Sequence, residues 1–195
     1  MPDSITLPES DRRQLLRGAG MTALGLGLMA VTDSALAATP RRHSATIASD
    51  VSVLQGALAL EHEGIAAYRI AAGSGLLSQG VIQVATVFLG HHEGHRDALA
   101  KLIRAAGATP VEPRSNDEYI KALNIASLKS EGDVVKFAAG LEQGATNAYV
   151  GQISALRDPK LAHLFGQLGT DEAVHWALLN SAAGGSVSKT PFLFA

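Results

Sequence analysis

Apolar residues recur at every third or fourth position along most of the chain beyond residue 48, and polar residues fill the positions between them. This period is typical of amphipathic α-helices, whose apolar stripe faces a protein core. The pattern predicts four long helices, over about residues 48–74, 76–106, 131–157 and 159–183. The chain is therefore predicted to be an all-α protein.

The connections between the predicted helices differ in length. Short breaks separate the first helix from the second and the third from the fourth, whereas residues 107–116 carry two prolines and interrupt the pattern for longer. A short helix is predicted within this crossover, over residues 117–126. Ser130 with Asp133 has capping-box spacing, and Asp158-Pro159 is a favourable start for the last helix. The chain is thus predicted to form two helix pairs joined by one long crossover.

The N-terminal residues have the features of an export signal. Arg12-Arg13 is followed by a short, glycine-rich apolar run over residues 18–32 and by the small-residue site Ala35-Leu36-Ala37. This order predicts a twin-arginine signal peptide over residues 1–37, a linker over residues 38–47 and a periplasmic or otherwise extracytoplasmic protein. The twin-arginine translocase is then the expected partner during export. An uncleaved membrane anchor is the second choice because the apolar run is short, and a cytoplasmic protein is the third.

Composition narrows the chemistry that this chain can perform. Hydrophobic residues make up 47% and charged residues 17%, enough to bury a sizeable core. The net charge is −2 without a basic block, so nucleic acid is not expected as a partner. There is no cysteine, which excludes disulfides, thiol chemistry and cysteine-held metals. Any metal must be held by His, Glu and Asp.

The two predicted helix pairs carry the same polar pattern. Tyr68 follows Glu61 by seven residues (68 − 61), and Tyr149 follows Glu142 by the same seven (149 − 142). Seven residues span two helical turns, so each Glu and its Tyr share one face. This spacing is the first sign of an internal repeat.

A second pair of polar residues, three positions apart, completes each half of the repeat. These pairs are His92 with His95 and Glu172 with His175. The first begins 31 residues after the Glu of its half (92 − 61), and the second begins 30 residues after its own (172 − 142). Such agreement between the halves indicates a duplicated helix pair.

These polar residues fall within the apolar stripes and are predicted to face the core. The stripes are Leu54, Leu58, Glu61, Ile65 and Tyr68; Val81, Ala85, Phe88, His92, His95, Leu99 and Leu102; Val135, Ala138, Glu142, Ala145, Tyr149 and Ile153; and Leu161, Phe165, Leu168, Glu172, His175 and Leu179. An unpaired buried carboxylate is costly or takes up a proton, and a bound cation removes that penalty. Imidazole and carboxylate suit Fe(II), Mn(II) or Zn(II). The alternative is a metal-free core in which the Glu and His side chains hydrogen-bond to one another.

The complete pattern resembles the dimetal signature of the ferritin-like superfamily, in which two helices each give one Glu and two others each give Glu-x-x-His. It is most similar to bacterial exported ferritin-like domain proteins. The resemblance implies a ferritin-like four-helix bundle over residues 48–185, with the long crossover between helices two and three, and a site for iron or manganese, one or two ions. It implies these metal ligands: Glu61, His92, His95, Glu142, Glu172 and His175.

The sequence departs from this signature at His92, where the pattern would have Glu. In dimetal members the glutamates of the helix pairs bridge the two metals, which imidazole does not readily do. Three carboxylates also neutralise less of the positive charge of a dimetal centre than four carboxylates would. The departure therefore leaves open one ion, an asymmetric pair of ions, or none.

Other polar residues are assigned to the surroundings of the site. The hydroxyls of Tyr68 and Tyr149 are expected to meet its carboxylates, and Arg96 is expected to pair with Asp171 or Glu93. Asp171 is otherwise expected next to the ligands or in solvent. The remaining off-stripe histidines are predicted at the surface, with His91 a substitute ligand if its helix is rotated: His62, His91 and His163.

These features predict an exported metal-binding protein that reacts with oxygen or peroxide as an oxidoreductase, with no substrate specified. The alternative is a degenerate, metal-free helical bundle that acts as a structural or partner-binding protein of the cell envelope. Iron storage in a multi-subunit shell is a third reading. The apolar tail, residues 186–195, is expected to pack over the bundle or into a second subunit, which leaves a homodimer open.

Overall fold

The computed structural model describes residues 38–186, 188–189 and 191–194, and all the regular secondary structure among these residues is helical. The elements are α1 (Ala38–Gly73), α2 (Gln79–Ala105), α3 (Asn116–Ala122), a 3-10 turn η1 (Ile125–Ser127), α4 (Glu131–Gln152), a second 3-10 turn η2 (Ile153–Ala155) and α5 (Pro159–Ala182). The predicted signal peptide, residues 1–37, lies outside the described residues. None of the described helices is both long and apolar enough to cross a membrane.

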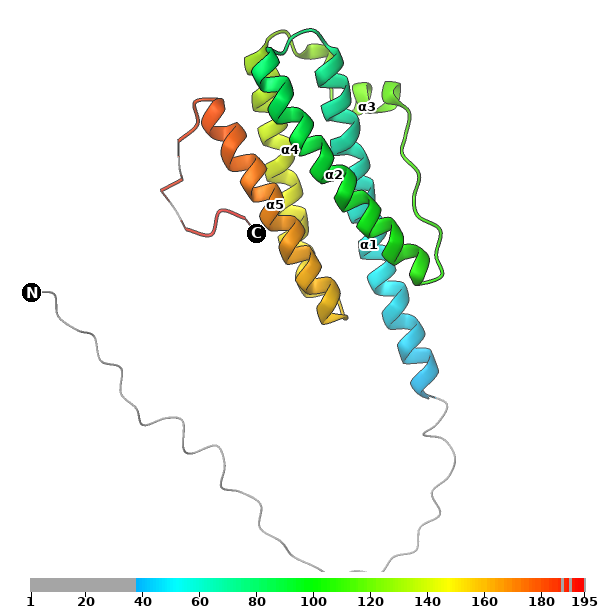
Figure 1. Cartoon of the computed structure of the whole chain (residues 1–195). Coiled ribbons are helices and arrows are strands. Elements are labelled where there is room, and N and C mark those ends of the chain that lie inside the picture. The colour runs from blue at the N-terminus through cyan, green and yellow to red at the C-terminus, as the bar shows by residue number, and fades with distance from the viewer. Residues whose placement is uncertain (1–37, 187, 190, 195) are drawn as a thin grey trace, which may run out of the picture. The chain divides into compact units, whose positions relative to one another are not determined.

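The four long helices form two hairpins that pack into one bundle (Figure 1). α1 packs along α2 and α4 along α5, and α1 also contacts α4. The long connection that carries α3 joins α2 to α4 and lies against α1. The prediction of an all-α four-helix bundle with one long crossover is confirmed.

Helix ends form where the sequence supplies capping groups. The Ser130 hydroxyl accepts a hydrogen bond from the Asp133 N–H at 3.1 Å and starts α4. Asp158 caps α5 by accepting from the Lys160 N–H at 2.8 Å, and Pro159 is the first helical residue. Each contact satisfies an N–H that has no partner inside the helix.

Three helix boundaries differ from the prediction. α1 begins at Ala38 rather than near residue 48, because Pro40 falls in the first turn, where its missing N–H costs nothing, and no further proline follows within the helix. α2 begins at Gln79 because Gly75, with φ of 73°, makes the preceding turn. α4 ends at Gln152, and the turn after it is held by the buried Asp50 carboxylate, which accepts from the backbone of residues 157 and 158 at 2.9 and 3.0 Å.

The core consists of two apolar clusters with a polar layer between them. One cluster contains Leu54, Leu58, Leu99, Ile103, Phe165 and Leu168. The other contains Tyr68, Ala85, Phe88, Val135, Ala139 and Leu179. In every long helix the Glu and His residues of the repeat lie in sequence between members of the two clusters. The bundle thus surrounds its central polar residues with apolar packing above and below.

Candidate metal centre

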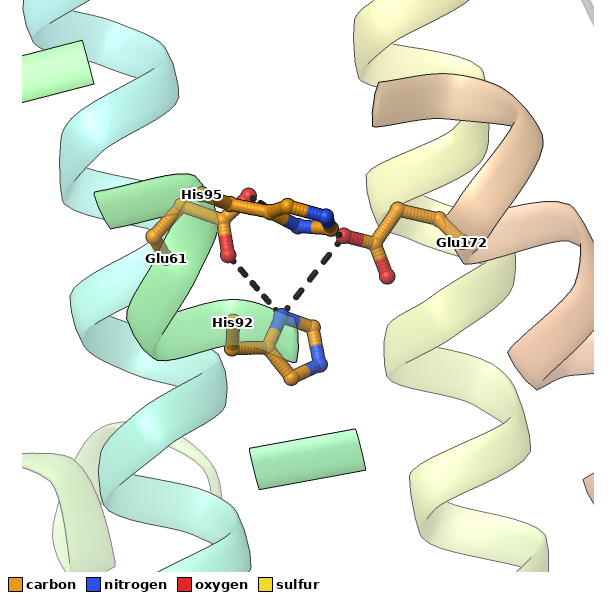
Figure 2. Close-up of side chains that lie close together, drawn as sticks. All are labelled: Glu61, His92, His95 and Glu172. Carbon is orange, nitrogen blue, oxygen red and sulfur yellow. Dashed lines mark hydrogen bonds and ion pairs between the residues drawn. The ribbon is translucent and has the colours of Figure 1, made fainter. Parts of the chain in front are cut away.

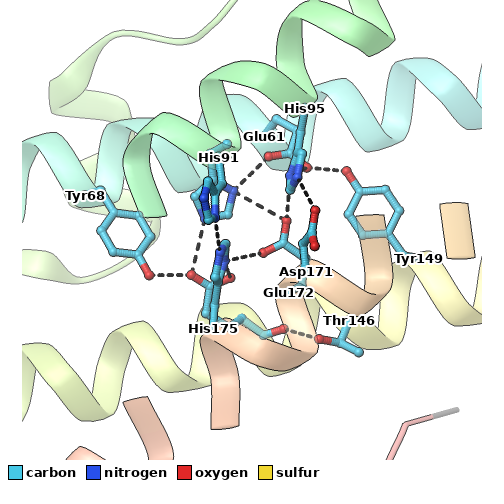
Figure 3. A network of polar contacts seen from close by, with 11 residues as sticks. Glu61, Tyr68, His91, His95, Thr146, Tyr149, Asp171, Glu172 and His175 are labelled. Atoms are coloured by element: carbon cyan, nitrogen blue, oxygen red, sulfur yellow. Dashed lines mark hydrogen bonds and ion pairs between the residues drawn. The ribbon is translucent and has the colours of Figure 1, made fainter. Parts of the chain in front are cut away.

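The six residues predicted as metal ligands come together in the middle of the bundle. Figure 3 shows Glu61, His95, Glu172 and His175 among them. α1 supplies Glu61, α2 supplies His92 and His95, α4 supplies Glu142, and α5 supplies Glu172 and His175. None of the six is more than 8% exposed. Because the i,i+3 pairs share a helix face, each of α2 and α5 delivers two side chains to the same point.

His92 lies at the centre of the cluster and faces three carboxylates. Its Nδ1 is 2.8 Å from Glu61 Oε2 and 3.6 Å from Glu172 Oε1 (Figure 2). Its Nε2 is 3.2 Å from Glu142 Oε1. A carboxylate only accepts hydrogen bonds, so both ring nitrogens of His92 donate and the ring is an imidazolium.

The two histidines on either side of His92 share Glu172. His95 Nδ1 lies 3.0 Å from Glu172 Oε1, and His175 Nδ1 lies 3.1 Å from Glu172 Oε2. Glu172 is fully buried. Its two oxygens are held by histidines from two different helices, α2 and α5. Glu172 therefore links the α2 and α5 sides of the centre.

The two tyrosines of the repeat cross between the halves. Tyr68 donates its hydroxyl hydrogen to Glu142, and Tyr149 donates to Glu61. The expectation that these hydroxyls meet the carboxylates of the site is confirmed. Each tyrosine of one half thereby fixes the Glu of the other half.

Two residues just outside the cluster complete the histidine hydrogen bonds. His91 Nδ1 lies 2.9 Å from His175 Nε2, and Asp171 Oδ2 lies 3.2 Å from His95 Nε2. His91 and Asp171 are exposed, as the sequence predicts, and they occupy the same position of the repeat, directly before the first residue of each pair. Each reaches across to the histidine of the other half. Sequence reasoning treated these residues separately and missed the symmetry, which their shared register would have signalled.

The prediction for Arg96 is wrong. Arg96 pairs with its neighbour Asp97 at 2.8 Å, while Glu93 pairs with Arg69 at 2.5 Å. Asp171 instead faces His95. Arg96 therefore makes no ion pair with either residue that the sequence offered, because the adjacent Asp97 is within easier reach.

The charges of the cluster stabilise one another. Burial by itself would lower the pKa of His92, but hydrogen bonds to Glu142 and Glu61 raise it to about 11. Burial likewise opposes the charge on His95, and hydrogen bonds to Glu172 and Glu61 raise its pKa to about 10. Burial would raise the pKa of Glu61, yet its hydrogen bonds to the two histidines hold it below the ordinary value. Without a metal, the imidazolium rings thus supply the positive charge that the carboxylates need.

The same side chains can hold a metal ion. Two overlapping sets each offer four ligand atoms that lie within 4.8 Å of one another, and every member is buried. One set is Glu61, His92, His95 and Glu172, and the other is His92, Glu142, Glu172 and His175. Carboxylate oxygen and imidazole nitrogen are ligands that iron, manganese and zinc accept. The donor set fits a metal ion, and its identity is open.

Comparisons with known proteins agree with this architecture. No curated protein matches the chain. A crystal structure of a conserved hypothetical protein, rv2844, from Mycobacterium tuberculosis is similar, with a TM-score of 0.63 and 23% sequence identity over 74% of this chain and 97% of that chain. At that identity the likeness shows the fold. The profile of the ferritin-like domain family matches residues 49–185, a span that contains all six residues of the cluster. This chain therefore belongs to the ferritin-like domain family.

Proposed function

We propose that this protein is an exported ferritin-like metalloprotein that binds iron or manganese, as one or two ions, in the centre of its bundle. The observation that carries the proposal is the convergence of three carboxylates and three imidazoles from four helices within a buried layer. A buried set of this kind is expensive to assemble unless charges compensate one another. A divalent cation would compensate the carboxylates more completely than the imidazolium rings do.

The chain's own residues would bind and orient the metal. Glu61 and Glu142 would enter from α1 and α4, Glu172 would hold the middle, and His95 and His175 would bind from the α2 and α5 sides. His92 belongs to both sets, and its position between three carboxylates favours one ion or an asymmetric pair over two equivalent ions. When bound, iron or manganese supplies redox chemistry and open positions for dioxygen or peroxide.

The surrounding groups would keep the ligands in place. Tyr68 and Tyr149 hold Oε1 of Glu142 and Oε1 of Glu61 respectively. Oε2 of Glu142 would then face a metal directly, whereas Oε2 of Glu61 would do so once His92 Nδ1, which holds it at 2.8 Å, gives it up. His91 and Asp171 hold the outer nitrogens of His175 and His95 and so orient the inner nitrogens towards Glu172. The two apolar clusters exclude water from both ends of the layer. We propose an oxidoreductase or protective role in the periplasm, reached through the twin-arginine translocase because of Arg12-Arg13.

Elemental analysis tests the proposal directly. Protein purified without added metal or chelator, and then loaded anaerobically with Fe(II) or Mn(II), is expected to hold one or two equivalents of metal. The variant Glu172→Ala is expected to hold none, because it removes the carboxylate common to both sets. Circular dichroism of the variant serves as the control for folding. Wild-type protein that takes up neither metal after loading would overturn the proposal.

A metal-free bundle is the second candidate, and one observation favours it. Among the described residues, every buried side-chain nitrogen or oxygen already has a hydrogen-bond partner. The cluster is therefore satisfied without an ion, and it could serve as a structural core of an envelope protein that binds a partner. In that case Glu172→Ala lowers the melting temperature of a protein whose wild type holds no metal.

A further inference from the structure

A groove between α1 and α4 leads down to the candidate metal centre. It encloses about 210 Å³. Its floor contains Glu61, His92 and Glu142, each no more than 3% exposed. Its walls are formed by Leu60, Gly64, Gly140, Leu141, Gly144 and Ala145. The groove thus reaches half of the candidate ligands from the outside of the bundle.

Two glycines on α4 keep this groove open. Gly140 and Gly144 are exposed, one turn apart on the same helix face, and a Cβ built at either would meet no atom within 4 Å. Packing within the chain therefore does not require glycine there, although glycine disfavours the interior of a helix. Because both glycines line the groove, a large side chain at either position would add bulk to its wall. We infer that these positions lack side chains because the groove must be passable.

The opposite side of the centre is covered. On the α2 and α5 side, His91 and Asp171 occupy the outer nitrogens of His175 and His95. The Phe88 ring stacks on the ring of His175 with centroids 4.1 Å apart. An incoming molecule would have to displace these contacts, whereas the α1–α4 groove reaches the floor without doing so.

The lining indicates what the groove would accept. It contains no lysine or arginine, and its charged members are Glu61, Glu63 and Glu142 together with His92. Glu63 pairs with Arg114 at 3.1 Å, and the floor carboxylates are held by His92 and the tyrosines. The groove therefore offers no free cation to bind an anion, while its leucine and glycine walls suit a molecule with an apolar surface.

We propose that the α1–α4 groove is the entry route and binding pocket for a small uncharged reactant of the candidate metal centre. The size excludes polymers and large cofactors, and the lining excludes anions. This inference rests on the proposed function for its reactant, but the groove itself can be tested in metal-free protein.

Because the chain contains no cysteine, a single introduced thiol reports access without background. The variant Ala145→Cys places this probe in the half-buried wall, between the exposed rim and the floor. Methyl methanethiosulfonate, which is small and uncharged, is expected to react about tenfold faster than the anionic 2-sulfonatoethyl reagent, after each rate is divided by that of a free thiol. Equal normalised rates would overturn the assignment to uncharged molecules.

A second substitution tests whether the route passes the two glycines. Adding Gly144→Leu to the probe variant is expected to slow the uncharged reagent about tenfold. Adding Gly151→Leu, on the same helix but outside the groove, is the matched control and is expected to leave the rate unchanged. Neither leucine meets an atom where its Cβ would lie, so both variants should melt at or above the temperature of the probe variant. An unchanged rate with Gly144→Leu would overturn the route.

Metal measurements on the same variants separate this inference from the proposed function. With the cysteine omitted, the Gly144→Leu variant is expected to bind as much Fe(II) as wild type. Dioxygen is expected to oxidise this bound Fe(II) about tenfold more slowly than in wild type. If metal content is normal while the thiol and oxidation rates are both unchanged, the proposed entry route is wrong and the proposed metal centre is unaffected. If the thiol rate is slowed but the protein binds no metal, the pocket exists as proposed but is not a route to a metal.

Discussion

The two halves of the bundle supply the same kinds of side chain at the same register, and they differ at one ligand position. α1 and α2 contribute Glu61, Tyr68, His91, His92 and His95, whereas α4 and α5 contribute Glu142, Tyr149, Asp171, Glu172 and His175. Tyrosines and outer residues cross between the halves in both directions. At the central position, however, one half carries the imidazole of His92 and the other carries the carboxylate of Glu172.

The residue that faces this central position also differs between the two halves. Gly64 lies three residues after Glu61, and its counterpart three residues after Glu142 is Ala145. A Cβ at position 64 would lie 3.3 Å from Nδ1 and Cε1 of His92, tighter than ordinary contact. The first half has therefore made room for a ring, and the ring brings a positive charge to the centre. The comparison teaches that the halves divide the charge between them, so that the buried carboxylates have cationic partners within the chain; this is the basis for proposing one ion or an asymmetric pair.

The most drastic way to remove this difference is His92→Glu. It would restore four carboxylates at the centre, and without metal their repulsion and burial should destabilise the protein by about 3 kcal/mol, which lowers Tm by roughly 6–12 °C. Fe(II) should restore Tm, and the metal content should rise towards two equivalents. Calorimetry and elemental analysis measure both effects, with His163→Glu at an exposed site on α5 as the control. An unchanged Tm in metal-free protein would show that His92 does not supply the compensating charge.

The pH dependence of the metal-free protein sharpens the same point. The pKa values of His92 and His95 are raised above 6.5 to about 11 and about 10, so their contribution to stability is complete below pH 6.5 and is lost as pH rises towards these values. The pKa values of Glu61 and Glu142 lie below 4.5, so their contribution is present above pH 4.5 and is lost in stronger acid. Denaturant unfolding should therefore show maximal stability between about pH 4.5 and 6.5.

Metal binding should show the opposite trend over neutral and alkaline pH. Histidines must release their protons to bind a metal, so affinity should rise with pH while metal-free stability falls. The variant His92→Gln should lose much of the alkaline decline in stability. A metal-free stability that increases between pH 7 and 10 would contradict the charge assignment.

Substitution of the two tyrosines tests whether Glu142 and Glu61 are held equally firmly by their other hydrogen-bond donors. Tyr68→Phe leaves Glu142 Oε1 with His92 Nε2 at 3.2 Å, whereas Tyr149→Phe leaves Glu61 Oε1 with only a long contact to His95, 3.6 Å. Each variant should cost about 1–2 kcal/mol, since a buried acceptor loses a donor, and Tyr149→Phe should cost more. Urea unfolding of the two variants measures the difference. The reverse order would indicate that His92 does not hold Glu142.

The smallest effect is expected from the outer residues. His91→Ala should weaken metal binding about tenfold by releasing His175, and Asp171→Ala should do the same through His95. His91→Gln, whose amide oxygen can accept the same hydrogen bond, should recover most of the affinity. His163→Ala is the control. A titration with Co(II) measures all four variants, and equal affinities throughout would show that the outer contacts do not orient the ligands.

Much of this molecule could be predicted from the order of its residues. The helix period located the four long helices, and the polar residues at stripe positions had to meet, because two halves with the same register pack their stripes against a common axis. Burial of the six candidate ligands follows from that symmetry. The tyrosine contacts were also predictable, since Glu and Tyr share a face in both halves.

Other features depend on contacts between segments far apart in the chain. The connection between α4 and α5 is held by Asp50, which accepts two backbone hydrogen bonds from residues 107 and 108 positions away. Glu93, which the sequence offered to Arg96, instead pairs with Arg69 of α1, 24 residues away. No local pattern records such distances.

By itself, the sequence determined the fold class, the repeat and the set of side chains that face the core, because helical periodicity is a local property that repeats along the chain. Only the tertiary structure decided that His92 faces three carboxylates, that His91 and Asp171 cross to the histidines of the opposite half, and that a groove reaches the floor between α1 and α4. These features depend on the rotation and separation of helices about a shared axis, which packing of the whole core sets to within an ångström or so.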